Sequence, residues 1–184
     1  MNQYPFHTPE SAPASAAPIL EKAKATLGFV PNLYAGLANA PAALEAYIAL
    51  SGFFEKTSLS AIERQVVLLA TSVDNGCEFC VAAHSMIAKK IVGVPEPVVA
   101  AVREGREPDD VKLAALVALT RAIVQERGWV ANHPALQRFL AAGFSKEQAL
   151  EVVLGVTQKT LSNYANHLLG TPLNPAFESE RWSR

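Results

Sequence analysis

The sequence predicts an all-α protein built as one domain. Alanine is abundant, and no stretch alternates apolar and polar residues over the length of a strand. Instead, apolar residues recur with a period of about 3.6 between residues 13 and 169. The 184 residues are half hydrophobic, which is enough for one core without metal or disulfide support. We therefore expect a helical domain over 13–170, between a flexible segment 1–12 and a loose tail 171–184.

Two apolar stripes identify helices in the first half of the chain. Within each stripe the residues stand three or four positions apart, so they share one face of a helix, and that face should meet a core. The first stripe consists of Leu44, Tyr47, Ile48, Ser51 and Phe54, and the second of Ile62, Val66, Leu69 and Val73.

Capping signals mark where further helices begin. Ser60 with Glu63, and Ser145 with Gln148, fit the capping box, in which two side chains satisfy unpaired amide groups reciprocally. The helix after Ser145 should run to about residue 169, and others are expected over 113–124 and 134–142. Glycine and proline residues separate the helices: Gly28, Pro31, Gly93, Pro95, Pro108, Gly128 and Gly170.

The charge balance narrows the classes of partner. Lys and Arg number 16 and Asp and Glu number 17, giving a formal net charge of -1. This lacks the basic excess that attracts nucleic acid or anionic membranes, and it suits a small neutral substrate. Residues 1–12 do not resemble a secretory signal, and no segment reaches membrane-spanning length. We expect a cytoplasmic protein.

The chemistry is expected at Cys77, Cys80 and His84. A helix is predicted to begin near Asn75, which can cap it, with Cys77 in the first turn. Residues i and i+3 have Cβ atoms roughly 5–6 Å apart, so the two cysteines can form a disulfide with modest adjustment. His84 follows Cys80 by four residues and can take its proton, whereas the helix N-terminus favours thiolate at Cys77.

Other interpretations of the cluster remain open. Two buried cysteines and one histidine can simply fill a core. A zinc site would use the same three residue types, but the sequence offers no second cysteine pair, and His7, His133 and His167 are not at finger-like spacings. A thioredoxin-like fold would require βαβ patterning, which is not visible. We therefore favour redox chemistry without a metal or other cofactor.

The cluster and its flanks resemble a known family. Leu59–Arg64 followed by Asn75–His84 is similar to the alkylhydroperoxidase D core of the carboxymuconolactone decarboxylase superfamily. Two segments before the core, Phe29–Tyr34 and Ala40–Leu44, and one after it, Asn163–Pro172, resemble the peroxidase-related branch. The similarity covers most of the chain.

The resemblance implies an all-helical antioxidant protein that assembles as a homo-oligomer, commonly a trimer or hexamer. It would reduce hydrogen peroxide or a small organic hydroperoxide, with Cys80 as the peroxidatic and Cys77 as the resolving cysteine. A dithiol reductant protein, dihydrolipoyl or thioredoxin-like, would then restore the reduced form. Decarboxylase members of the superfamily do not use this cysteine pair, so a decarboxylase-like enzyme is the weaker alternative.

Several residues bear on this resemblance. The family's proton-relay glutamate normally stands twelve residues before the first cysteine, where this chain has Gln65, which cannot accept a proton. A redox-sensing or weakly active oligomer is therefore a second alternative. Phe79 replaces a histidine that some members carry, and it should pack or make the pocket more apolar. The polar group Tyr164, Asn166 and His167 is expected near the cysteines, with capping or interface roles favoured over binding.

Overall fold

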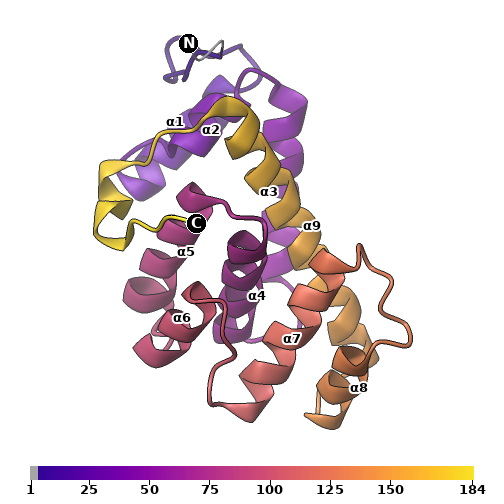
Figure 1. Ribbon diagram of the computed structural model, residues 1–184. Helices are drawn as coiled ribbons and strands as arrows, with labels where there is room; N and C mark the ends of the chain where they lie inside the picture. Colours follow the sequence, from indigo (N-terminus) through magenta and orange to yellow (C-terminus); the bar gives the residue numbers. More distant parts are fainter. Residues whose placement is uncertain (1–3) are drawn as a thin grey trace.

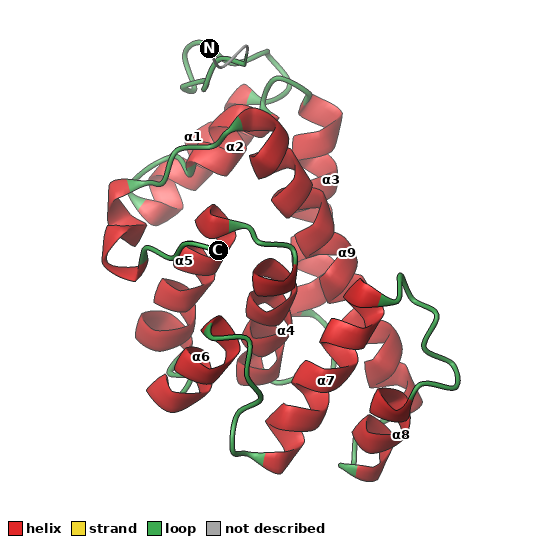
Figure 2. Ribbon diagram, in the orientation of Figure 1, coloured by secondary structure: helices red, strands yellow, loops and turns green. Residues whose placement is uncertain are grey.

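The computed structural model describes residues 4–184, and within that range the chain forms helices and no strand (Figure 2). The all-α prediction is confirmed. The helices are α1 (Ala17–Leu27), α2 (Asn32–Leu37), α3 (Pro41–Glu55), α4 (Ala61–Asp74), α5 (Glu78–Ile87), η1 (Ala88–Val92), α6 (Glu96–Arg103), α7 (Val111–Gln125), α8 (Pro134–Ala141), α9 (Lys146–Leu169) and η2 (Pro175–Glu180).

Helix α4 lies at the centre of the arrangement and contacts α5, α6, α7 and α9 (Figure 1). Both capping boxes that the sequence predicts are present. The Ser60 hydroxyl accepts from the Glu63 amide at 3.2 Å, and the Glu63 carboxylate accepts from the Ser60 amide at 2.7 Å. The same two hydrogen bonds join Ser145 and Gln148 at 3.0 Å and 2.9 Å. These caps fix the starts of α4 and α9, the two helices that carry the apolar centre and one wall of the site.

The start of α5 differs from the prediction. Asn75 is the C-cap of α4, where its amide donates to the Thr71 carbonyl at 3.0 Å, and its side chain donates to Asn163 of α9 at 2.9 Å. Gly76 turns the chain with a left-handed φ of 66°, and Cys77 becomes the N-cap of α5. The prediction of a start near Asn75 is wrong because the tertiary contact with α9 uses the asparagine side chain that would have capped the helix.

The buried residues form two clusters. The larger one joins α4 to α3, α5, α6, α7, α8 and α9, with Phe54, Leu69, Leu116 and Phe139 among its members. The smaller one joins α1, α2, α3, α5 and η2, and it contains both cysteines. The candidate site therefore sits in a core of its own, in contact with α9.

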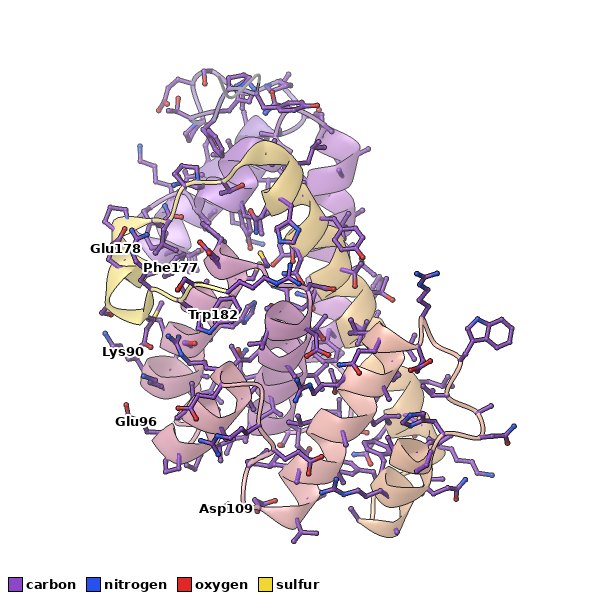
Figure 3. The ribbon with its side chains drawn as sticks, viewed as in Figure 1. Lys90, Glu96, Asp109, Phe177, Glu178 and Trp182 are labelled. Carbon is purple, nitrogen blue, oxygen red and sulfur yellow. The ribbon has the colours of Figure 1, made fainter. Side chains whose placement is uncertain are left out.

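The C-terminal segment packs on the helices, in contrast to the loose tail that we expected. Beyond α9 it returns across the molecule toward α5 (yellow in Figure 1). Phe177 is buried and packs edge-on against Phe79, with 5.8 Å between ring centroids. The Trp182 indole donates to the Arg103 carbonyl of α6 at 3.1 Å, and Figure 3 labels both aromatic residues. The expectation failed because these two aromatic side chains find apolar partners in the fold.

At the other end, residues 1–3 of the segment expected to be flexible lie outside the described residues. Residues 4–12 form a loop in which the His7 amide donates to the Ala35 carbonyl at 3.1 Å. Across the described chain, no helix combines the length and apolar character that crossing a membrane requires.

A close approach of three helices occurs at Gly155, in the middle of α9. A Cβ atom built there would lie 2.6 Å from Cζ of Phe54 in α3 and 2.8 Å from Cγ1 of Val67 in α4. Both neighbours are buried in the core. Glycine is therefore required here by packing, although it weakens a helix.

We predict that Gly155→Ala lowers the free energy of unfolding. Overpacking costs about 1–3 kcal/mol, which exceeds the gain of about 1 kcal/mol in helix propensity. Gly52→Ala in α3 is the matched control, since its Cβ would have no neighbour within 4 Å and the substitution should stabilise the protein. Urea denaturation of both variants measures the two effects, and a stabilised Gly155→Ala protein would contradict the close approach.

Candidate active site

The two cysteines are free thiols at the start of α5, where Cys77 is the N-cap and Cys80 lies in the first turn, and each has only 1% of its surface exposed. Cys80 borders a cavity of about 260 Å³, whereas Cys77 is not part of its lining. The cavity wall is mostly apolar and aromatic. It includes Phe29, Leu33, Tyr34, Phe79, Met86 and Phe177. Only Cys80 of the pair is therefore placed to meet a molecule inside this cavity.

Helix α9 supplies the polar groups around the sulfur atoms. The Asn166 amide nitrogen donates to Sγ of Cys80 at 3.2 Å and lies 3.8 Å from Sγ of Cys77. The Lys159 ammonium nitrogen lies 3.7 Å from the same sulfur of Cys80, and the Ser162 hydroxyl lies 3.9 Å from it. Three side chains that can donate hydrogen bonds to a thiolate thus surround Cys80.

His84 is connected to Cys80 through Lys159. Its Nε2 atom lies 2.7 Å from Nζ of Lys159, and its Nδ1 atom lies 3.0 Å from Oε1 of Gln65. Within the described part of the chain, the side chains that hydrogen-bond to Cys80 are those of α9 and Cys77, and His84 is not among them. Our expectation that His84 takes the Cys80 proton directly does not match this geometry, because the Lys159 side chain occupies the space between them.

The hydrogen bonds assign the histidine tautomer. The Gln65 oxygen can only accept, so the ring proton sits on Nδ1 and Nε2 is left to accept from Lys159. Burial, together with the positive charge of Lys159, holds the pKa of His84 well below its usual value. His84 is therefore a neutral imidazole, and the positive charge at the site belongs to Lys159.

The surroundings shift the pKa values of the two cysteines in opposite directions. The Cys77 thiol donates a hydrogen bond to the Cys80 sulfur, and this bond, with the charge of Lys159 and the Ser162 hydroxyl, lowers the pKa of Cys80 although burial opposes it. The same hydrogen bond and burial raise the pKa of Cys77. The surroundings therefore favour the thiolate form of Cys80 and the thiol form of Cys77.

Lys159 is the site residue that the sequence analysis missed. Only 1% of its surface is exposed, and no ion pair within residues 4–184 joins it to a carboxylate. Its Nζ atom lies 5.9 Å from the ring centre of Tyr47. The missed signal is its place among the buried residues of α9, which are Val152, Gly155, Val156, Gln158, Lys159, Ser162, Asn163, Asn166 and Leu169.

Of the other residues that the sequence analysis singled out, some lie at the site and some do not. Cys77, Cys80, His84 and Gln65 lie together in one network. Asn166 lies at the cysteines, but Tyr164 is 60% exposed and stacks on His167 instead. Phe79 both packs on Phe177 and lines the cavity. Over residues 4–184, no group of three or more histidine, cysteine, aspartate or glutamate side chains is placed to hold a metal ion.

Comparison with known proteins agrees with the fold. The family model described as carboxymuconolactone decarboxylase family matches residues 38–120, from the end of α2 to α7. Over this segment the chain is similar to the carboxymuconolactone decarboxylase family, in agreement with the motif resemblance. No curated protein matches the sequence significantly.

Solved structures share the fold over nearly the whole chain. The alkylhydroperoxidase D core of a peroxidase-related protein from Ralstonia eutropha JMP134 is 23% identical, with a TM-score of 0.83 over 95% of this chain and 93% of that one. A peroxidase-related protein from Silicibacter sp. TM1040 is 17% identical, with a TM-score of 0.80 over 97% and 93%. A debrominase, solved as a cysteine-to-alanine variant with 2,3,4-tribromopyrrole, is 17% identical, with a TM-score of 0.78 over 96% and 94%.

Proposed function

We propose that this chain is a dithiol peroxidase that reduces small hydroperoxides through a Cys77–Cys80 disulfide. One observation carries the proposal: of two buried cysteines, the one that opens to the cavity is also the one that its neighbours hold as thiolate. Only a thiolate attacks a peroxide at a useful rate. The similarity to the family model and to peroxidase-related structures supports a peroxidase-related role, and the geometry supports the order of the two cysteines that the resemblance implied.

In the first step the Cys80 thiolate attacks the distal oxygen of a hydroperoxide, ROOH. A sulfur–oxygen bond forms, the oxygen–oxygen bond breaks, and the departing alkoxide takes a proton from the site to leave as ROH. Cys80 is then a sulfenic acid. In the second step the Cys77 sulfur displaces its hydroxyl, which leaves as water with the Cys77 proton, and the disulfide forms.

A dithiol must then return two electrons to the disulfide. Both cysteines are buried, so a reductant has to reach the sulfur atoms through the cavity or after a local movement. The narrow, mostly apolar cavity suits the slender arm of a dihydrolipoyl group better than the surface of a thioredoxin-like protein. We therefore favour the dihydrolipoyl partner. Assembly as a trimer or hexamer and a cytoplasmic location stay predictions.

Turnover separates catalysis from sensing. We expect the reduced protein to consume many equivalents of an organic hydroperoxide per subunit when a dihydrolipoyl-type dithiol is present. The redox-sensing alternative predicts oxidation that stops after one equivalent, with no further consumption once the disulfide has formed. A peroxide assay with and without the dithiol distinguishes them. Consumption of one equivalent under both conditions would remove the enzyme assignment and keep the thiol pair as a reporter.

A second reaction suits the same residues. The aromatic cavity wall resembles a site for a planar ring, and the debrominase with this fold binds a brominated pyrrole. Reductive dehalogenation balances with the same cysteines: an aryl bromide, one thiolate and one thiol give the arene, bromide and a disulfide. Release of bromide from a bromopyrrole in the presence of a dithiol, at a rate above that of peroxide consumption, would favour this reaction over the peroxidase.

A further inference from the structure

We propose that Lys159 is a catalytic residue of the peroxide reaction, whose ammonium group pairs with the Cys80 thiolate and gives a proton to the departing alkoxide. This inference rests on the proposed peroxidase function. It assigns to α9 the task that the sequence motif suggests for His84 of α5.

The first argument is the charge of a buried lysine. Lys159 is almost completely buried, and its close polar contacts are Nε2 of His84 at 2.7 Å and Sγ of Cys80 at 3.7 Å. A charge without a partner is very costly in such surroundings. His84 is neutral and offers only a lone pair, so the Cys80 thiolate is the anion that can balance the ammonium group. The two charges stabilise each other.

The second argument concerns the direction of the hydrogen bonds. Gln65 accepts from Nδ1 of His84, which leaves Nε2 without a hydrogen atom and turned toward Lys159. His84 therefore has no proton to give on the side of the sulfur. Gln65 and His84 are positioning residues: they hold the Lys159 ammonium group, whose remaining hydrogen atoms are free to face Cys80 and the cavity.

The third argument concerns the charges at the site, given that this chain has Gln65 where the resembling motif has a glutamate. The resemblance places a glutamate at position 65, where its negative charge would suit a protonated His84. Glutamine removes that negative charge, and Lys159 brings the positive charge that a neutral His84 no longer supplies. In this chain the Cys80 thiolate therefore has one cationic partner, the Lys159 ammonium group. Gln65 thus marks an altered relay rather than a lost one.

The cycle balances with Lys159 as the proton donor. Thiolate, Cys77 thiol, Lys159 ammonium and ROOH give the disulfide, ROH, water and a neutral Lys159 amine. The site carries no net charge before or after. Reduction by a dithiol delivers two electrons and two protons, which restore the Cys77 thiol, the Cys80 thiolate and the Lys159 ammonium group. Other titratable groups face the site from three elements, namely Cys77 and His84 of α5, Tyr34 of α2 and Tyr47 of α3.

The test begins with Lys159→Met, which keeps the length of the side chain and removes its charge. We expect the midpoint of Cys80 alkylation by iodoacetamide to move upward by about one pH unit or more, and sulfenic acid formation at neutral pH to slow by about tenfold or more. Lys146→Met, at the exposed start of the same helix, is the control and should change neither. Unchanged midpoint and rate in a folded Lys159→Met protein would overturn the proposal.

Lys159→Arg separates the two tasks. Arginine keeps the positive charge but does not release a proton at any relevant pH. The alkylation midpoint should therefore stay low. Reaction with tert-butyl hydroperoxide should slow by about tenfold or more, whereas reaction with a peracid, whose carboxylate leaves without a proton, should be nearly unchanged. Equal slowing with both oxidants would contradict the role as proton donor.

A rescue experiment distinguishes a chemical role of Lys159 from a merely structural one. Adding Gln65→Glu to Lys159→Met places a carboxylate at Nδ1 of His84, which favours the imidazolium form. We expect this second change to restore at least part of the thiolate and of the rate, which no structural role for Lys159 would explain. If the wild-type protein does not turn over hydroperoxide but Lys159→Met still shifts the alkylation midpoint, the peroxidase function is rejected and the ion pair between Lys159 and Cys80 stands. If the wild-type protein turns over hydroperoxide but Lys159→Met does not shift the midpoint, only the role of Lys159 is rejected.

Discussion

Cys80→Ser protein should consume no hydroperoxide beyond the uncatalysed background, whereas Cys77→Ser protein should react once and stop with a sulfenic acid on Cys80. The asymmetry follows from the site. Cys80 lines the cavity and is held as thiolate, while Cys77 lies outside the lining and its pKa is raised. Serine at 77 can still donate a hydrogen bond to the Cys80 thiolate, so the first attack should remain fast.

The measurement is trapping with a dimedone-type reagent followed by mass spectrometry of each single variant. The wild-type protein, in which the disulfide forms quickly, is the control and should show little label on either cysteine. A label on Cys77 of the Cys80→Ser protein, with none on Cys80 of the Cys77→Ser protein, would reverse the two roles. That result would mean that the helix N-terminus, where Cys77 is the N-cap of α5, outweighs the hydrogen bonds from α9.

Local signals were enough to predict most of the fold. The capping boxes at Ser60 and Ser145 depend on side chains three residues apart, and they are present as expected. Apolar periodicity likewise identified α4, α7, α8 and α9, because the buried face of a helix follows from its own sequence. The start of α5 was misplaced for the opposite reason. Asn75 is used by Asn163, 88 positions away in the chain, and no local pattern reports such a contact.

The candidate site shows the same division. Cys77, Cys80 and His84 share one helix, and a spacing rule brought them together on one face. Gln65 was singled out by its position twelve residues before Cys77, and its side chain does contact His84. Lys159 stands 75 positions after His84, and the sequence showed it only as the one charged residue among the buried residues of α9. Its meaning appears once α9 is packed on α5, since the thiolate and the lysine are each costly to bury alone.

The C-terminal segment is a further case in which a tertiary contact decides the structure. We expected a loose end after Gly170, yet Phe177 completes the cavity wall against Phe29 and Phe79. Each aromatic side chain buries a large apolar area, so Phe177 and Trp182 can hold this short segment against the helices. The tail is thus part of the candidate site rather than an appendage.

Asn166→Leu should make Cys80 much less reactive at neutral pH without weakening the fold. The Asn166 amide donates to the Cys80 sulfur at 3.2 Å, and a hydrogen bond to a charged group contributes about 1.5–3 kcal/mol. This corresponds to a rise of about one to two units in the pKa of Cys80. The amide oxygen of Asn166 is buried without a partner, so a leucine of similar shape also removes an unsatisfied acceptor.

The sign of the pH dependence makes the test specific. The site lowers the pKa of Cys80, so the wild-type thiolate persists as pH falls below the ordinary thiol value of about 8.5. In Asn166→Leu protein the thiolate should protonate within that window, slowing alkylation by about tenfold or more near neutral pH, and the difference should vanish at alkaline pH. His167→Leu, on the exposed side of the same helix, is the control. An alkylation profile equal to that of the wild type would show that Lys159 and Cys77 hold the thiolate without Asn166.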